Sequence, residues 1–195
     1  IISKMAVNTV MSGPASGVIA AAYTATVSGH PNVITCDMGG TSCDVGLIKE
    51  GVPQVSTELE IEYAMPIHVP MVDVRTIGAG GGSIAQISAA GILEVGPESS
   101  GAVPGPICYG RGGRNPTITD ANMVMGRLNP AMMVSSEVSI EDVASILDEK
   151  IAKPLNLSTA DEAAAAIIHI ANNKMAGALR LVSLARGHDP RDFVL

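Results

Sequence analysis

The sequence predicts an α/β fold in which helices pack on a mixed sheet. Two apolar, β-branched runs within residues 33–48 flank a Gly-Gly pair, a pattern typical of a β-hairpin. Residues 54–63 alternate between polar and apolar side chains, as in a half-buried strand. Residues 159–187 carry apolar side chains at helical spacing. The 195 residues are therefore interpreted as one domain, with 49–118 as a β-rich and loop-rich excursion.

Along the first third, residues 5–11 are predicted to form a strand that leads to a helix. Ser12 is expected to be the N-cap of that helix, and Gly29 is expected to end it. The hairpin 33–48 comes next, followed by a turn at 49–53.

In the middle of the chain, residues 67–77 are expected to be extended up to a glycine cluster. Residues 84–87 and 92–95 flank a turn and predict a second hairpin. Residues 96–116 are rich in Gly, Pro and Ser and predict a long loop, a kind of segment that is often functional.

The last third is predicted to be helical. A helix is expected over 119–127 with Thr119 as its cap, and another over 139–150 after an S-x-x-D start. The longest helix opens with a T-x-x-E capping box at 159–162. Its predicted buried stripe consists of Ile167, Ala171, Met175, Ala178, Val182 and Ala185.

Composition excludes several classes of function. The net charge is −7 and the pI about 5.0, so no basic field is available for nucleic acid or an anionic membrane. The three cysteines lack C-x-x-C spacing, which indicates neither a disulfide framework nor a zinc site and favours the cytoplasm. No apolar stretch is long enough to span a membrane, and no targeting segment is visible. Because the chain starts inside an apolar run and stops at Phe193, Val194 and Leu195, we expect a fragment of a longer polypeptide.

The hairpin carries the strongest candidate site. Gly39 and Gly40 at its tip permit close backbone approach, so their N–H groups, with the hydroxyls of Thr41 and Ser42, can face an anion. Asp37 precedes the turn and would repel a bare anion but could hold one through a hydrated divalent cation. A nucleotide phosphate with magnesium meets these conditions, whereas an ordinary tight turn capped by Asp37 is the alternative.

Asp44 lies seven residues after Asp37, in the return strand. It is interpreted as a structural partner of the turn, with the alternative that both carboxylates flank one metal ion.

A second candidate site is the glycine run GAGGGS, from Gly78 to Ser83. It matches neither G-x-x-x-x-G-K-[ST] nor G-x-G-x-x-G, so a P-loop and a Rossmann turn are excluded. A run with so few side chains indicates that a ligand or another segment of the chain packs directly against its backbone. We expect Gly78, Gly80, Gly81 and Gly82 to contact the nucleotide in the active site, with a neighbouring helix or the substrate as alternatives.

Other reactive side chains have structural interpretations. Cys108 has no evident histidine partner and is expected to be a buried thiol rather than a nucleophile. Asp120 is expected to cap a helix, with metal or substrate contact as the alternative. Asp73 and Arg75 share one face of a predicted strand and form either an ion pair or a ligand contact.

Five motifs in a fixed order resemble the hydantoinase A and 5-oxoprolinase family: DMGGT at 37–41, TIGAGGGS at 76–83, PGPICYG at 104–110, PTITDAN at 116–122 and GHDPRDF at 187–193. The resemblance starts at Ser12 and reaches the last residue. It implies an actin/hexokinase-like (ribonuclease H-like) ATPase fold, of which this chain is a part. In that fold the hairpin at Asp37 corresponds to the second phosphate motif, so the chain is expected to hold half of an ATP site.

The resemblance also implies an activity. The parent protein is expected to be an ATP- and magnesium-dependent hydrolase that opens a cyclic amide, a hydantoin or a 5-oxoproline-like lactam, after phosphorylating its carbonyl oxygen. Asp37 would act on the magnesium ion and on the attacking oxygen. A B-type hydantoinase subunit or domain would complete the reaction, which implies a hetero-oligomer. The isolated piece is expected to be inactive.

Three positions depart from the family pattern. Cys43 replaces the usual threonine, Gln86 replaces the usual aromatic residue, and Glu94 replaces a residue that is commonly basic. None of them alters the turn, but Gln86 and Glu94 leave the substrate open. The alternatives are a subunit of an ATP-dependent ketone carboxylase of the acetone or acetophenone type, or a catalytically silent nucleotide-binding or assembly piece. Which lactam or ketone is used does not follow from the sequence.

Overall fold

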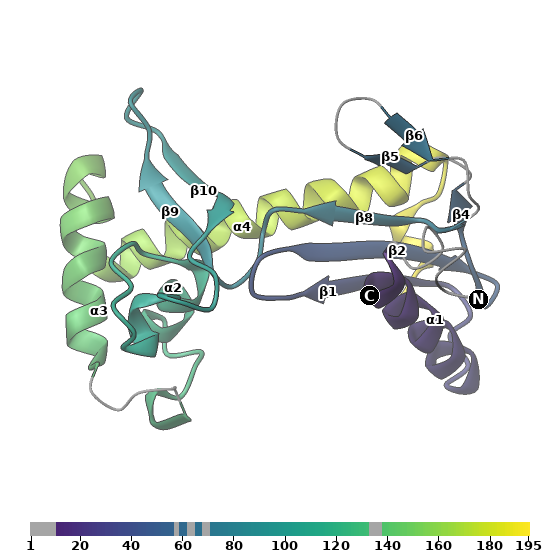
Figure 1. Ribbon diagram of the computed structural model, residues 1–195, viewed down its shortest axis with the longest axis horizontal. Coiled ribbons are helices and arrows are strands. Elements are labelled where there is room, and N and C mark those ends of the chain that lie inside the picture. The colour runs from purple at the N-terminus through teal and green to yellow at the C-terminus, as the bar shows by residue number, and fades with distance from the viewer. Residues whose placement is uncertain (1–10, 57–58, 62–64, 68–70, 133–137) are drawn as a thin grey trace. The chain divides into compact units, whose positions relative to one another are not determined.

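The computed structural model describes residues 11–56, 59–61, 65–67, 71–132 and 138–195 (Figure 1). Internal contacts divide the chain into two compact units. Unit 1 comprises the described residues of Ile1–Asp37, Asp44–Thr76 and Gly177–Leu195, and unit 2 those of Met38–Cys43 and Ile77–Ala176. The chain passes between the units at 37–38, 43–44, 76–77 and 176–177, and the third of these points lies inside the segment 49–118. The single-domain organisation stays a prediction.

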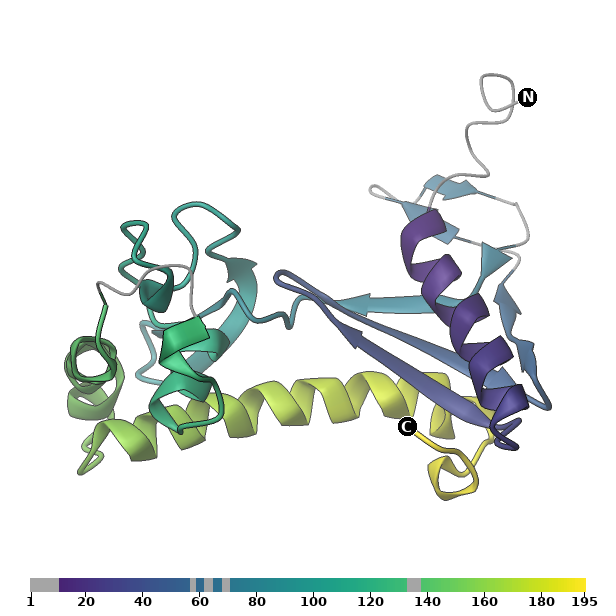
Figure 2. The same ribbon diagram turned by 90° about the horizontal axis from the view of Figure 1, so that it is seen from below.

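Unit 1 is built on a four-stranded sheet that carries helix α1 (Ser12–Val27) (Figure 2). Strands β1 (Val33–Met38), β2 (Cys43–Lys49) and β3 (Val52–Pro53) are adjacent in that order, and β8 (Val74–Ile77) pairs with β2. The predicted first hairpin is therefore confirmed. The C-terminal residues join its edge, because Val194 forms a parallel bridge with Val33.

The glycine at position 46 lets α1 lie directly on β2. A Cβ at Gly46 would lie 2.8 Å from Val18 Cγ2 and 3.0 Å from Thr35 Oγ1. The Thr35 hydroxyl also accepts the Gly46 N–H at 3.0 Å, which ties β1 to β2 at this level. One buried cluster of unit 1 consists of Val18, Ala22, Val33, Ile48 and Val74.

The predicted strand 54–63 is wrong as one element. The chain instead forms β4 (Val55–Ser56) and β5 (Leu59–Ile61), which pair with different partners. Strand β4 pairs antiparallel with β7 (Met71–Val72), and β5 pairs antiparallel with β6 (Met65–Ile67). Alternating polarity does not distinguish one strand from two, because both keep a period of two.

Unit 2 combines a β-hairpin with helices. Strands β9 (Ser83–Ile87) and β10 (Leu93–Ser99) form the predicted second hairpin. The helices are η4 (Ile107–Tyr109), α2 (Ile118–Val124), η5 (Pro130–Met132), α3 (Ile140–Leu147), the π-helical η6 (Asp148–Ala152), η7 (Lys153–Leu155) and α4 (Ala160–Val182). They bury a core whose largest side chains are Met123, Leu147, Ile151, Ile167, Val95 and Val143. The end of α4 belongs to unit 1, together with η8 (Leu184–Arg186) and η9 (Pro190–Asp192).

The helix starts and ends agree only in part with the sequence. Ser139 forms the expected capping box, here with Asp142, and Gly29 follows α1 with φ of 79°. The cap of α2 is Thr117 rather than Thr119, because Asp120 completes a box with Thr117. Likewise, Ser12 is the first residue of α1 and its cap is Met11, which has left-handed backbone dihedrals. The strand expected at 5–11 lies outside the described residues except for Met11.

Helix α4 is shorter than predicted at its C-terminal end. It stops at Val182, and the chain continues as the separate turn η8 before Gly187. Four members of the predicted stripe are buried (Ile167, Ala171, Ala178 and Val182), Met175 is half-buried, and Ala185 is exposed in η8. None of the described helices is long and apolar enough to cross a membrane.

The contact between α1 and β2 generates a first prediction. We expect Gly46→Ala to lower the free energy of unfolding by about 1–3 kcal/mol, because the new methyl group displaces Val18 or Thr35. Gly13→Ala is the control, since a Cβ at Gly13 meets nothing within 4 Å. Thermal denaturation of the intact protein measures both variants. Equal melting temperatures for Gly46→Ala and Gly13→Ala would contradict the proposed packing.

Candidate functional site

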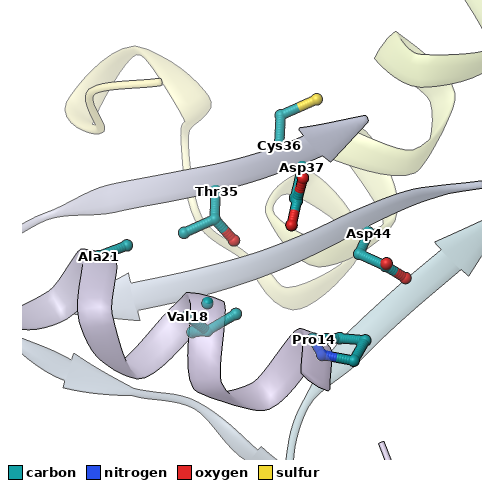
Figure 3. A pocket seen from close by; sticks show the side chains of 8 residues that line it. Pro14, Val18, Ala21, Thr35, Cys36, Asp37 and Asp44 are labelled. Atoms are coloured by element: carbon teal, nitrogen blue, oxygen red, sulfur yellow. The ribbon is translucent and has the colours of Figure 1, made fainter. Parts of the chain in front are cut away.

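A pocket of about 280 Å³ lies in unit 1 between α1 and the hairpin strands (Figure 3). Its lining residues are Pro14, Gly17, Val18, Ala21, Thr35, Cys36, Asp37 and Asp44. Thr35 and Asp37 point from β1 towards α1, whereas the Cys36 side chain points to the opposite face (Figure 3). The walls are thus apolar on the helix side and acidic on the strand side. The helix side of the pocket was not predicted from the sequence, although Gly17 inside a helix is a signal of close approach.

Asp37 is exposed, and within the described part of the chain its carboxylate has no hydrogen bond or ion pair from another side chain. A Cβ at Gly17 would lie 3.9 Å from Asp37 Oδ2, so α1 passes close to the carboxylate without covering it. The alternative interpretation, in which Asp37 is consumed as a turn cap, finds no supporting bond among these residues. The Asp37 carboxylate is therefore available to a ligand.

Asp44 is half-buried and is oriented by β8. The Thr76 hydroxyl donates to Asp44 Oδ1 at 2.5 Å, which leaves the second carboxylate oxygen without a side-chain partner among the described residues. The Asp44 side chain is thus both a structural partner and a wall of the pocket. Thr76 had no assigned role in the sequence, although it opens the motif that contains the glycine run.

The carboxylates of Asp37 and Asp44 could bind magnesium only together with other ligands. Among the described residues no group of three or more His, Cys, Asp or Glu could hold a metal ion by itself. Magnesium is usually held by one or two carboxylates together with phosphate oxygens and water. Asp37 and Asp44 match that donor set, and a phosphate ligand would have to supply the rest.

The turn of the hairpin, residues 38–43, belongs to unit 2. Gly39 N–H donates to the Ser42 carbonyl at 2.8 Å and closes the turn, so this amide does not face an anion. Among the described residues the N–H groups of Gly40 and Thr41 have no backbone partner outside the strand ladder. Both residues are exposed, and Ser42 is half-buried. Among the described residues, the amides of Gly40 and Thr41 and the hydroxyls of Thr41 and Ser42 are thus donors of the turn that no hydrogen bond to the glycine run engages.

The glycine run packs against this turn. Gly81 N–H donates to the Gly39 carbonyl at 2.9 Å, and Gly82 N–H donates to the Gly40 carbonyl at 2.7 Å. A Cβ at Gly80 would lie 2.5 Å from the backbone N and C atoms of Thr41. The element that approaches the glycine backbone is therefore the turn itself. Gly80 N–H is also engaged, because it donates to Ser83 Oγ at 2.9 Å.

Gly78 serves a different contact. A Cβ at Gly78 would lie 2.8 Å from Pro97 Cβ, so the position permits β10 to approach the start of the run. Direct contact of Gly78, Gly80, Gly81 and Gly82 with a nucleotide stays a prediction.

Asp120 is a buried structural carboxylate. Oδ2 accepts hydrogen bonds from Thr117 N–H at 2.9 Å, Thr117 Oγ1 at 2.7 Å and Ile107 N–H at 3.2 Å. Oδ1 accepts Cys108 N–H at 2.9 Å. Every one of these donors belongs to the loop 104–117 or to the cap of α2, so Asp120 joins the loop to the helix. Its predicted capping role is confirmed.

Cys108 is fully buried against the same carboxylate. Burial raises the pKa of the Cys108 thiol far above its usual range, and the negative charge of Asp120 raises this pKa further. A thiol held in its protonated form is a poor nucleophile. The expectation of an inert buried cysteine is consistent with this geometry.

Asp73 and Arg75 form an ion pair at 3.7 Å, which was one of the two interpretations of these residues. Asp73 is 7% exposed and also pairs with Arg186 of η8, which holds the C-terminal residues to β8 within unit 1. With two cationic partners, Asp73 has its charge compensated and is a structural residue.

Comparison with known proteins gives one family. The family model described as Hydantoinase/oxoprolinase matches residues 2–195. The chain is 46% identical to the caprolactamase subunit alpha of Pseudomonas jessenii, over all of this chain and 28% of that protein. It is 40% identical to the acetophenone carboxylase gamma subunit of Aromatoleum aromaticum, over 94% of this chain and 25% of that protein. The chain therefore spans about a quarter of the length of these relatives.

Solved structures give the same result. The crystal structure of the ATP-dependent caprolactamase from Pseudomonas jessenii is similar with a TM-score of 0.83 and 46% identity, over 93% of this chain and 26% of that one. The nucleotide-free structure of acetone carboxylase is similar with a TM-score of 0.81 and 31% identity, over 93% of this chain and 26% of that one. The α/β fold is thus shared with both enzymes.

The burial of Asp120 generates a second prediction. We expect Asp120→Ala to lower the free energy of unfolding by about 2–4 kcal/mol, because it leaves several buried donors unpaired. Asp142→Ala is the matched control, since Asp142 occupies the same position in the capping box of α3 but is exposed. Thermal and urea denaturation of the intact protein should give a much smaller loss for the control. Losses of the same size would show that burial of Asp120 contributes nothing.

Proposed function

Because the chain belongs to the hydantoinase/oxoprolinase family, we propose that the intact protein uses ATP to open a cyclic amide, a hydantoin or a 5-oxoproline-like lactam. The main observation behind the proposal is the exposed carboxylate on the hairpin. Near the end of strand β1, just before the glycine turn, Asp37 presents an exposed carboxylate without a side-chain partner in the described part of the chain. Relatives of this chain include a caprolactamase subunit and a 5-oxoprolinase, which supports a cyclic amide as the substrate.

The chemistry follows from the poor reactivity of an amide carbonyl. Transfer of the γ-phosphoryl group of ATP to the carbonyl oxygen forms an O–P bond and releases ADP. Water then attacks the carbonyl carbon and the ring C–N bond breaks, which frees the amine and leaves an acyl phosphate. A second water hydrolyses the acyl phosphate to the carboxylate and inorganic phosphate. Catalysis of such a transfer is mainly positioning and charge stabilisation.

Each candidate residue has a role in this proposal. The accessible amides of Gly40 and Thr41, with the hydroxyls of Thr41 and Ser42, would bind phosphate oxygens. Asp37, and Asp44 beside it in the pocket, would hold magnesium directly or through water. When bound, magnesium would neutralise charge on the phosphates. Gly39 closes the turn, and Gly78, Gly80, Gly81 and Gly82 lie in the proposed nucleotide site either as contacts or as its support.

The proposal extends to the fold and the assembly. We assign the sheet of unit 1, with α1, to one half of an actin/hexokinase-like (ribonuclease H-like) ATPase fold, with the hairpin as its second phosphate motif. A B-type subunit or domain would complete the hydrolysis, and several relatives are named as subunits, which supports a hetero-oligomer. We propose a cytoplasmic location on the basis of the cysteine count and spacing alone.

A ketone carboxylase is the second candidate. It would use the same phosphorylation but pass an activated enol to carboxylation. The 40% identity to an acetophenone carboxylase subunit and the likeness to acetone carboxylase favour it. A catalytically silent nucleotide-binding or assembly role is the third candidate for the 195 residues taken alone.

The role of Asp37 generates a third prediction. We expect Asp37→Asn in the intact protein to lower the kcat of ATP-dependent turnover by at least about 100-fold, because the amide cannot replace a carboxylate that holds a metal ion or a proton. The melting temperature should be unchanged, since Asp37 is exposed. Asp192→Asn is the control, an exposed carboxylate outside the pocket, and should retain full turnover. Turnover by Asp37→Asn within a few-fold of the unmodified protein would refute the assignment.

Substrate choice generates a fourth prediction. The intact complex should hydrolyse ATP faster when a hydantoin, 5-oxoproline or caprolactam is added without bicarbonate, and should release the ring-opened acid. Acetone or acetophenone with bicarbonate should give no stimulation. Liquid chromatography of the products and an assay of phosphate release should be carried out with the cyclic amides and with the ketones. Stimulation confined to the ketones with bicarbonate would establish the carboxylase instead.

A further inference from the structure

We propose that Thr119, from the motif PTITDAN at residues 116–122, is a positioning residue that sets the conformation of the phosphate turn through the backbone of Gly81. The inference rests on the proposed function, which assigns the turn to nucleotide binding but gives this motif no part in it. All of the contacts involved lie within unit 2.

Helix α2 makes two hydrogen bonds to the glycine run. Both the N–H and the hydroxyl of Thr119 donate to the Gly81 carbonyl, each at 2.8 Å. The same peptide segment reaches the turn, because Gly81 N–H donates to the Gly39 carbonyl at 2.9 Å. Gly81 thus links the first turn of α2 to the phosphate turn.

The next residue, Gly82, repeats this arrangement. The N–H and the hydroxyl of Ser100 donate to the Gly82 carbonyl at 2.8 and 3.1 Å, while Gly82 N–H donates to the Gly40 carbonyl at 2.7 Å. Two successive carbonyls are therefore each held by a hydroxyl residue, and the two matching N–H groups hold successive carbonyls of the turn. A regular pattern of this kind fixes direction as well as distance, because each carbonyl has both of its lone pairs occupied.

The position of Thr119 is itself fixed. It lies between Thr117 and Asp120, whose capping box anchors α2 and the loop 104–117. The Thr119 hydroxyl takes no part in that box, which uses the side chains of Thr117 and Asp120. Removing this hydroxyl therefore spares the cap of the helix and acts on Gly81, and through it on the turn.

The absence of side chains in the run permits close packing on both of its sides. A Cβ at Gly80 would overlap the backbone of Thr41, and a Cβ at Gly81 would lie 2.8 Å from Thr119 Oγ1. The run therefore lies directly against both neighbours. We expect a change at Thr119 to reach the amides of Gly40 and Thr41, which the proposed function assigns to phosphate.

The test compares Thr119→Val, which keeps the shape and removes the hydroxyl, with Thr119→Ser, which keeps the hydroxyl. In the intact protein the Kd for MgATP, measured by calorimetry, should rise about tenfold for Thr119→Val, because nucleotide binding then has to restore the order of the turn that the lost hydrogen bond supplied. It should stay within about threefold of the unmodified value for Thr119→Ser. Amide hydrogen exchange of residues 38–43 without nucleotide should be faster in Thr119→Val.

Thr159→Val is the matched control. Thr159 also lies at a helix start and accepts Glu162 N–H at 3.2 Å, but it does not contact the glycine run. It should lower the melting temperature without changing the Kd or the exchange at 38–43. If Thr119→Val does not fold, Ser100→Ala gives the same measurements through Gly82.

The outcomes separate the two proposals. An unmodified protein that does not bind MgATP would refute the nucleotide site, while faster exchange at 38–43 in Thr119→Val would still support the positioning role. Unchanged exchange and an unchanged Kd in Thr119→Val, with only a lower melting temperature, would overturn the positioning role.

Discussion

At Gly80 and Gly82 the glycine run lies so close to the backbone of Gly40 and Thr41 that a Cβ at either position would overlap it. This constraint organises the candidate site. A two-residue glycine turn at the tip of a hairpin has little conformational preference of its own, because glycine loses more backbone entropy on ordering than any other residue. The hydrogen bonds from Gly81 and Gly82 supply the order that the turn lacks. They also leave the outer amides of the turn free, since the run satisfies carbonyls rather than N–H groups.

The support of the turn is itself built on a buried charge. A carboxylate without exposure is costly unless its oxygens are fully hydrogen-bonded. Asp120 meets that condition with donors from the loop 104–117 and from the cap of α2, and the burial of Cys108 keeps its thiol protonated. The loop with many prolines and glycines is thus ordered by a helix start rather than by a core of its own. Its functional importance, on this view, is to hold α2 where Thr119 can reach the glycine run.

Local pattern was sufficient for elements whose partners are close in sequence. The hairpins at 33–48 and 84–95 and the capping box at Ser139 follow from turns and caps that need only a few neighbouring residues. The lack of side chains at residues 78–82 correctly indicated that another segment packs against their backbone. That segment is the turn at 39–41, which lies far earlier in the chain, and no local sequence signal identifies it. The cap of α2 was misplaced because Thr117 and Thr119 both lie at the helix start, and only the position of Asp120 distinguishes them. The split of 54–63 depends on strand pairing with other segments, which periodicity does not contain.

Four aspartates show how environment decides which carboxylates can do chemistry. Asp120 is saturated by neutral donors and Asp73 by two arginines, so neither has an oxygen to offer a ligand. Asp44 is held by Thr76 through one oxygen, and Asp37 by no side chain in the described part of the chain. A charge left without a partner in a folded protein is tolerated cheaply only where water reaches it, and Asp37 is exposed. The same exposure that makes this carboxylate inexpensive to keep also leaves both of its oxygens open to a ligand, because no hydrogen bond to another side chain of the described residues has to be given up.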